Sequence, residues 1–496
     1  MNTPQIENRT SEGVLQKSIR AGKWLTIDYI VQKAVAILPF FILARILSPE
    51  QFGIASIILL VPRFLQTTSE HGLTAAVIQK GGDVKKYLDA IWTLNVLRGV
   101  CISILVFIAG PFIARFYHVE DYTWIIRLGG FFILIRQCTN IGEIWLIKDL
   151  VFKKIFIRNT VRAVAYSTIS IIAAYFLRSY LALVIGNLAL YLAELVMTYV
   201  LHPYRPRFFF KFGILKDLVG YSKWITGQAL GDQAYAFMEN SIIAHTTNTT
   251  TVGLYSKAKN LASIGPGFTS SIISMIAFPA FVQIKDAPEK IVDGLKKSLD
   301  LLFVVTMPII FFIQVAGGKL VLLVLGTPWL PITFALRIFL VYFILIYMVD
   351  ICSKLLSAIG HPDKKVKLDI IKTILSLVLL LYFTPRYGTN GAAVAILLGF
   401  IPTFFLTLHY LQSLTHITYW NIFIRVGFPL FLAGGLMAPL AIFKNTLMQQ
   451  SLTILIILTV LYFALYCLGI YAVGKKFHRG PYMTIELILK KIFLRV

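Results

Sequence analysis

Ionisable side chains lie deep inside long apolar runs of this chain, where each is costly to keep. The five that lie furthest from the ends of their runs are Lys33, Arg63, Arg98, Arg136 and Asp232. All but Asp232 are basic. Because guanidinium groups bind phosphate oxygens in bidentate fashion, these positions predict a hydrated, cationic cavity suited to a pyrophosphate-bearing head group. The alternative is that each charge pairs with another across helices for structural reasons.

Acidic residues in the apolar runs suit ion coupling. Asp232 and Glu239 are seven residues apart, as are Arg63 and Glu70, so each pair shares one helix face. Asp232 and Glu239, together with Glu70, are therefore candidates for coupling to a proton or sodium gradient. No other cofactor and no metal is expected.

Two further lysines, Lys257 and Lys259, are candidates for the cationic wall. They lie close to the outer end of their apolar run, so the alternative is that their side chains only extend to the membrane surface. Asp350 and Lys354 are one helical turn apart and are expected to neutralise each other.

The elements that position these residues are expected to be transmembrane helices. The 496 residues are 57% hydrophobic and 14% charged, with a mean hydropathy of +0.77, which is typical of a membrane protein. A spanning helix needs about 20 mainly apolar residues. On that criterion the sequence predicts an all-α integral membrane protein with about fourteen transmembrane helices, at 24–46, 52–78, 88–113, 122–147, 155–177, 180–201, 221–245, 252–284, 295–315, 331–359, 366–383, 388–411, 422–443 and 452–473.

The distribution of Lys and Arg between the loops predicts the orientation. If both termini are cytoplasmic, most of these residues fall in the inside tails and loops, and few fall in the loops opposite: Arg45, Arg115, Arg178, Lys319, Arg386 and Lys444. Cytoplasmic loops carry an excess of Lys and Arg. This distribution explains most of the net charge of +24 without a nucleic-acid partner.

The chain also contains an internal repeat. The stretch Ile42–Ser56 returns as Ile242–Ser256, with Gly53 matched to Gly253. Each copy has six predicted spans, an even number, so the two lobes are parallel repeats with a substrate cavity between them and access by rocking. The predicted parts are an N-lobe at 1–201, a cytoplasmic connector at 202–220, a C-lobe at 221–411, a helix pair at 412–474, and a basic amphipathic cytoplasmic tail at 475–496 that attracts anionic lipid.

Helix breakers fall at matched places of the two lobes. Pro62 precedes Arg63 in the second span, and Gly265-Pro266-Gly267 is expected to interrupt the eighth. Matched breaks point to a binding site or a hinge, although Gly and Pro are common in spanning helices.

Several motifs resemble one known family. Leu43–Ile54 reads LARILSPEQFGI, Gly72-Leu73 follows, and the second copy has Val252–Ser256, Phe278-Pro279 and Ser357–Gly360. This order resembles the polysaccharide transporter (Wzx-type flippase) family of the multidrug/oligosaccharidyl-lipid/polysaccharide (MOP) exporter superfamily. The resemblance implies lobes like those of MATE and MurJ, a V-shaped cavity lined by spans 1, 2, 7 and 8, and a lipid-tail groove at spans 13 and 14.

The resemblance and the basic residues together predict a flippase. It would move undecaprenyl-pyrophosphate-linked oligosaccharide from the inner to the outer leaflet of the bacterial cytoplasmic membrane, for exopolysaccharide, lipopolysaccharide O-antigen or a related polymer. A glycan polymerase and other biosynthesis proteins are expected partners. One alternative is a cation-coupled multidrug exporter, which predicts an acidic cavity. Another is a membrane glycan polymerase or glycosyltransferase, which the short outer loops disfavour, so no enzymatic activity is expected.

Overall fold

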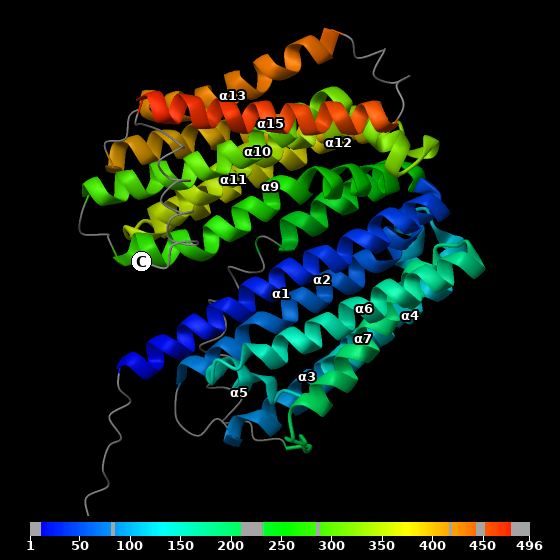
Figure 1. Ribbon diagram of the computed structural model, residues 1–496. Coiled ribbons are helices and arrows are strands. Elements are labelled where there is room, and N and C mark those ends of the chain that lie inside the picture. Colours follow the sequence, from blue (N-terminus) through cyan, green and yellow to red (C-terminus); the bar gives the residue numbers. More distant parts are fainter. Residues whose placement is uncertain are drawn as a thin grey trace, which may run out of the picture. The chain divides into compact units, whose positions relative to one another are not determined.

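The computed structural model describes residues 11–80, 85–209, 231, 233–283, 288–415, 419–442 and 452–477. Within these residues the regular structure is helical (Figure 1). The chain divides into two compact units, Met1–Gly253 and Leu254–Val496. Each buries apolar residues of its own, such as Ile58 in unit 1 and Phe339 in unit 2.

Unit 1 is a bundle of long helices. Helix α6 packs against α7 and α1, and α3 packs along α4. Leu43 and Ala55 form a buried cluster with Ala174 and Ala182, which ties α1 and α2 to α6 and α7. The elements are α1 (Ser11–Ile46), α2 (Pro49–Lys80), α3 (Lys85–Phe116), η1 (Glu120–Tyr122), α4 (Thr123–Gln137), α5 (Glu143–Lys148), α6 (Phe152–Leu177) and α7 (Leu181–Leu201).

Unit 2 is a second helical bundle. Helix α11 packs against α12 and α10, and α10 packs against α13, which in turn contacts α15. The elements are α9 (Thr249–Gln283, which begins just before the unit boundary), α10 (Pro288–Val324), η2 (Thr327–Trp329), α11 (Ile332–Ala358), α12 (Pro362–Thr415), α13 (Tyr419–Ile442) and α15 (Leu452–Phe477).

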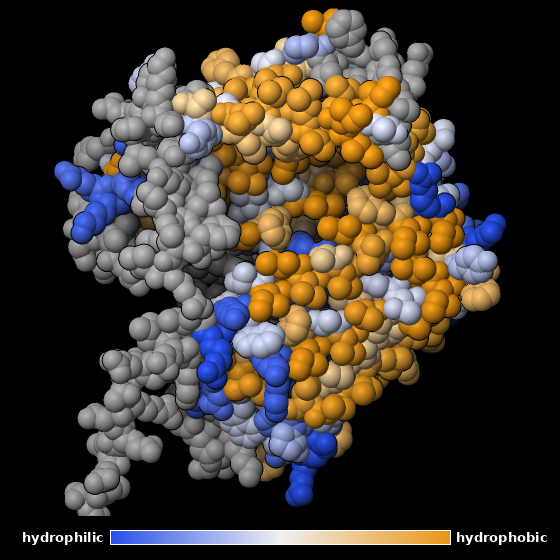
Figure 2. Space-filling model, in the orientation of Figure 1, coloured by the Kyte–Doolittle hydropathy of each residue, from blue (hydrophilic) through white to orange (hydrophobic). Residues whose placement is uncertain are grey.

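The surfaces of both units are apolar. Eight helices among the described residues are long and apolar enough to cross a membrane. Large apolar side chains face outward, for example Phe112, Phe176 and Phe431, which are 73–76% exposed, and Figure 2 shows broad hydrophobic areas on the visible face of each unit. Patches of this extent are not tolerated in water, so the chain is a multi-pass membrane protein.

Helix α12 consists of two helices. Its 54 residues are merged across Gly388, whose φ of 53° and ψ of −133° are not helical. At about 1.5 Å per residue the whole segment would be far longer than a bilayer is thick. The predicted spans 366–383 and 388–411 therefore correspond to the two halves of α12.

The expected span at 122–147 is not continuous. Helix α4 ends at Gln137, and the short helix α5 begins at Glu143. Asn140 lies in the turn between them, where its side chain accepts a hydrogen bond from the backbone N–H of Gly142 (2.9 Å) and donates one to the carbonyl of Tyr204 (2.6 Å). The prediction of one span was wrong because this side chain competes locally with the helix for backbone groups.

The expected interruption of the eighth span is absent as well. Helix α9 runs through Gly265, Pro266 and Gly267 without leaving helical geometry. Gly267 lies close to Tyr347, since an added Cβ would be 2.8 Å from the phenolic oxygen. Pro and Gly are tolerated inside membrane helices where neighbouring helices compensate the lost contacts, and the prediction of a break was wrong for that reason.

A proline in α10 creates the docking point for the C-terminal helix. Pro308 lacks an N–H, so the carbonyl of Val304, four residues earlier, has no helical donor. The buried hydroxyl of Tyr466 in α15 donates to this carbonyl at 3.0 Å. Tyr462 donates to the carbonyl of Pro308 at 3.2 Å. Two tyrosines one turn apart therefore fasten α15 to α10.

Replacing Tyr466 with phenylalanine is expected to lower the free energy of unfolding by about 1–3 kcal/mol, because the buried carbonyl of Val304 loses its donor. Thermal unfolding of the protein in detergent measures this. In a Pro308→Ala background the alanine N–H supplies the missing helical donor, so Tyr466→Phe costs less there. Equal losses in both backgrounds would contradict this explanation.

The described part of the predicted connector 202–220, residues 202–209, is attached to unit 1. Asp89 of α3 accepts hydrogen bonds from the hydroxyl of Tyr204 and, at 2.9 Å, from the backbone N–H of Arg207. One carboxylate therefore holds two points of an extended segment. The remaining connector residues, 210–220, lie outside the described residues.

This attachment is expected to weaken in alkali. Burial raises the pKa of Tyr204 above its ordinary value of 10.0, and the hydrogen bond and charge of Asp89 raise it further. The folded state holds the Tyr204 proton more tightly than the unfolded state does. The hydrogen bond from Tyr204 to Asp89 therefore stabilises the attachment fully below pH 10.0, and this stabilisation is lost as the pH rises through the folded pKa of Tyr204. An alkali-tolerant protease measures this as faster cleavage after Arg207. Tyr204→Phe should remove the pH dependence, and its persistence would exclude this origin.

Candidate functional site

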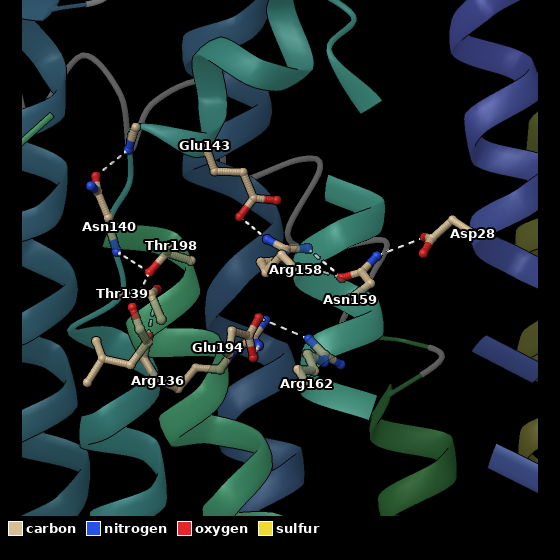
Figure 3. A network of polar contacts seen from close by, with 12 residues as sticks. Asp28, Arg136, Thr139, Asn140, Glu143, Arg158, Asn159, Arg162, Glu194 and Thr198 are labelled. Atoms are coloured by element: carbon tan, nitrogen blue, oxygen red, sulfur yellow. Dashed lines mark hydrogen bonds and ion pairs between the residues drawn. The ribbon is translucent and has the colours of Figure 1, made fainter. Parts of the chain in front are cut away.

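A buried charge triad joins three helices of unit 1 (Figure 3). Arg136 of α4 forms a short ion pair with one carboxylate oxygen of Glu194 on α7, and Arg162 of α6 donates to the other oxygen at 2.9 Å. The Glu194 side chain is 4% exposed. Two guanidinium groups thus share one carboxylate.

A second layer of polar contacts lies toward α5. Arg158 of α6 forms a short ion pair with Glu143, and its guanidinium also donates to Asn159 at 2.9 Å. The Asn159 amide in turn donates to Asp28 of α1 at 2.8 Å. Figure 3 shows this chain of contacts running from α5 across α6 to α1. The network holds α1, α4, α5, α6 and α7 in register.

The basic residues predicted in the first lobe differ in their exposure and in their contacts. Lys33 is exposed on α1, with its Nζ 5.6 Å from the centre of the Tyr29 ring. Arg63 is exposed on α2, within electrostatic reach of Tyr191 on α7. Arg98 of α3 is half-buried and donates to Asn95 (3.1 Å) and to Gln137 of α4 (3.2 Å).

Arg98 and Arg136 are linked only through adjacent residues of α4. Gln137, the partner of Arg98, follows Arg136 directly in α4. The structure thus connects two of the predicted residues along α4, and adds Arg162 and Glu194, which the sequence interpretation missed.

A signal for the missed residues was present. Arg162 lies seven residues into the predicted span 155–177, and Glu194 seven residues before the end of the predicted span 180–201. Consecutive spans are antiparallel, so both residues lie about 10 Å from the same membrane face. Two opposite charges at the same depth on neighbouring spans predict an ion pair, and this rule would have predicted the pair of Arg162 and Glu194.

The predicted residues of α9 face different partners within unit 2. Lys257 is buried, with its Nζ 5.7 Å from the centre of the fully buried Trp329 ring. Lys259 is half-buried, 5.6 Å from the centre of the Tyr255 ring. Both are cation–π geometries. Two residues apart on a helix, the two lysines leave α9 in nearly opposite directions.

The acidic candidates are described only in part. Glu239 is fully buried. Asp232 and the side chain of Glu70 lie outside the described residues. In unit 2 the predicted pairing of Asp350 with Lys354 is confirmed, with Nζ and the carboxylate 2.6 Å apart and Ser274 of α9 bonded to both.

The fold and these buried charges define a multi-pass helical membrane protein that carries arginines and acids inside its bundles. In sequence, a family model described as "Polysaccharide biosynthesis protein" matches residues 42–333. The chain belongs to this family, which confirms the predicted family.

Two relatives agree with this assignment, and a solved structure has a similar fold. The chain is 24% identical over 396 residues to the lipopolysaccharide biosynthesis protein WzxC of Escherichia coli K12, covering 78% of each chain. It is 24% identical over 355 residues to the teichuronic acid biosynthesis protein TuaB of Bacillus subtilis 168, covering 70% of this chain and 73% of TuaB. The structure of the lipid II flippase MurJ, inward closed, matches with a TM-score of 0.75 at 12% identity, covering 91% of this chain and 99% of MurJ. At this identity the match to MurJ shows the fold alone.

Proposed function

We propose that this protein is a flippase that translocates polyprenyl-pyrophosphate-linked oligosaccharide, with undecaprenyl as the carrier, from the inner to the outer leaflet by alternating access. The observation that carries the proposal is the presence of several arginines on the packed helices of unit 1. Arg98 lies on α3, and Arg136 of α4 and Arg162 of α6 share the carboxylate of Glu194. Guanidinium groups bind phosphate oxygens in bidentate fashion, so a pyrophosphate suits them.

The need for a transporter follows from the head group. Moving ionised groups from water into an apolar medium costs tens of kcal/mol by Born estimates, so a sugar pyrophosphate crosses only inside a polar site. The relatives WzxC and TuaB are named for biosynthesis of lipopolysaccharide and teichuronic acid. Their names support an envelope polymer as the destination. A glycan polymerase is the proposed partner.

Matched helix crossings support two parallel six-helix repeats. In unit 1, Ser170 of α6 meets Gly186 of α7, and in unit 2, Ser376 meets Gly399 across the two halves of α12. These are the fifth and sixth spans of each proposed repeat. The proposed parts remain the lobes 1–201 and 221–411, the connector 202–220, the helix pair 412–474 and the tail 475–496.

The proposed setting is the bacterial cytoplasmic membrane with both termini inside, because the Lys- and Arg-rich loops then face the cytoplasm. Asp232, Glu239 and Glu70 are the proposed groups for coupling to a proton or sodium gradient. Lys33, Arg63, Lys257 and Lys259 are proposed as further basic contacts of the substrate.

Proteoliposomes test the function. A lipid-linked oligosaccharide with a fluorescent sugar should become accessible to an impermeant quencher only when the protein is present. Arg98→Gln should slow transport about ten- to a hundredfold, since one hydrogen bond to a charged group contributes about 1.5–3 kcal/mol. Arg127→Gln is the matched control, because Arg127 lies on α4 against the Phe107 ring, 5.0 Å away, outside the triad. Transport of organic cations in place of the glycan would overturn the proposal in favour of a drug exporter.

A further inference from the structure

Two histidines that are distant in sequence stack on each other in unit 1. The ring centres of His118 and His245 are 5.5 Å apart, and the ring planes are 20° from parallel. His118 follows the end of α3, and His245 lies in the helical segment 233–246, which belongs to the same unit. Both residues are exposed. Ring nitrogens of this pair are therefore accessible to a solute.

The imidazole of His245 is held in place by the end of α3. Its Nδ1 lies 2.6 Å from the backbone carbonyl oxygen of Phe116, and its ring stacks on the Phe116 ring with centres 4.3 Å apart. One turn earlier in the segment, Ser241 shares a hydrogen bond of 2.8 Å with the hydroxyl of Tyr117. A carbonyl only accepts, so in the neutral ring Nδ1 carries the proton and Nε2 presents its lone pair. Metal-binding histidines are oriented in this way, by donating the other ring N–H to a carbonyl.

The backbone at His118 has a conformation that usually belongs to glycine. The N–H of His118 donates to the carbonyl of Arg115 at 3.2 Å, and that of Val119 donates to the carbonyl of Ala114 at 2.9 Å. This pair of bonds is the Schellman motif, in which the residue at the place of His118 is left-handed and most often glycine. His118 has a φ of 55°. Side chains held in such strained positions cluster at functional sites, which points to a role for this imidazole.

Two imidazoles this close together suit a transition-metal ion. Imidazole nitrogen is a preferred ligand of zinc, copper and nickel. Zinc lies about 2.0–2.1 Å from each such nitrogen, so rotation of the exposed His118 side chain is enough to let one ion contact both rings. Among the described residues there is no group of three or more potential ligands. Water then completes the coordination, as in an exchangeable site rather than a structural zinc site.

We propose that His118 and His245 bind one divalent transition-metal ion of the zinc type. The ion joins the end of α3 to the segment 233–246 and stabilises their contact. Only the placement of this site on the outer side of the membrane depends on the proposed orientation. Binding of the metal does not depend on the proposed translocation of a glycan, so the two proposals can fail separately.

Replacing His118 with glycine distinguishes a ligand from a structural residue. Glycine suits the left-handed backbone, so without metal the Tm of His118→Gly should equal or exceed that of the unsubstituted protein. Calorimetric titration of the full-length protein in detergent with Zn²⁺, after removal of any histidine tag, should show one bound ion. The affinity should fall at least about tenfold in His118→Gly. Zn²⁺ should raise the Tm of the unsubstituted protein by mass action and should leave that of the variant unchanged.

Two further variants complete the comparison. His245→Gln keeps an amide that can donate to the carbonyl of Phe116 but removes the imidazole, and it should weaken Zn²⁺ binding as much as His118→Gly does. His409 is the matched control, because it is exposed on α12, with its ring centre 6.2 Å from that of Tyr410. His409→Gln should bind Zn²⁺ as the unsubstituted protein does.

Three outcomes would overturn the proposal. Zn²⁺ binding that survives both His118→Gly and His245→Gln would place the metal elsewhere. An equal loss of affinity in His409→Gln would show only general binding to exposed histidines. A lower Tm of His118→Gly without metal, together with an unchanged Zn²⁺ affinity, would assign this histidine to packing.

Discussion

Replacing Glu194 with leucine is expected to lower the free energy of unfolding by about 3–5 kcal/mol, the cost of removing one partner from a buried ion pair. The carboxylate is buried between Arg136 and Arg162 and bonds to both. Without it, Arg136 and Arg162 lose the carboxylate they share, and their like charges repel each other. Thermal or denaturant unfolding of the protein in detergent measures the loss.

An exposed ion pair is the matched control. Asp293 and Lys297 form a contact of 2.6 Å on α10, but both side chains are about half exposed, so Asp293→Asn should cost less than about 1 kcal/mol. Replacing Glu194 together with Arg136 and Arg162 by apolar residues of similar volume should recover most of the stability. If the triple variant is as unstable as Glu194→Leu, the loss comes from packing rather than from charge.

Replacing Gly399 with alanine is expected to destabilise unit 2 by about 3 kcal/mol, at the upper end of the cost of overpacking. The new Cβ would lie 2.6 Å from the Cα and 2.7 Å from the backbone nitrogen of Ser376. Backbone atoms cannot rotate away, so the two halves of α12 must separate. Gly186→Ala in unit 1 meets mainly the Ser170 side chain, whose Oγ would be 1.7 Å away, and should cost somewhat less.

Gly435 of α13 is the control for both substitutions. Nothing lies within 4 Å of a Cβ added there. Because alanine favours a helix over glycine by about 1 kcal/mol, Gly435→Ala should be neutral or stabilising. Unfolding in detergent compares the three variants. A loss at Gly435 as large as that at Gly399 would contradict the argument from close packing.

The class of fold and the family could be predicted from sequence because both depend on local features. Apolar runs of spanning length predicted membrane helices, and Asp350 with Lys354 could be paired from helical spacing alone. The motif around Leu43–Ile54 indicated the family that the match over residues 42–333 confirmed.

The details of the site depend on contacts between distant residues. Glu194 meets Arg136 across 58 positions of sequence, and single-helix spacing carries no information about such a pair. Asn140 breaks a predicted span because the carbonyl of Tyr204 lies within its reach. Pro266 fails to break another because the membrane penalises any departure from the helix. In the first two cases the deciding partner is distant in sequence.

The reversal at Gly388 bears on how the chain is inserted during synthesis. With a positive φ at a single glycine, the two halves of α12 are joined without a loop that could be translocated by itself. The close contact between Ser376 and Gly399, near the middle of the two halves, then lets the halves pack together as soon as both have been synthesised. This pair should enter the bilayer as one hairpin, so a tag inserted at Gly388 would interfere with biogenesis rather than report on topology.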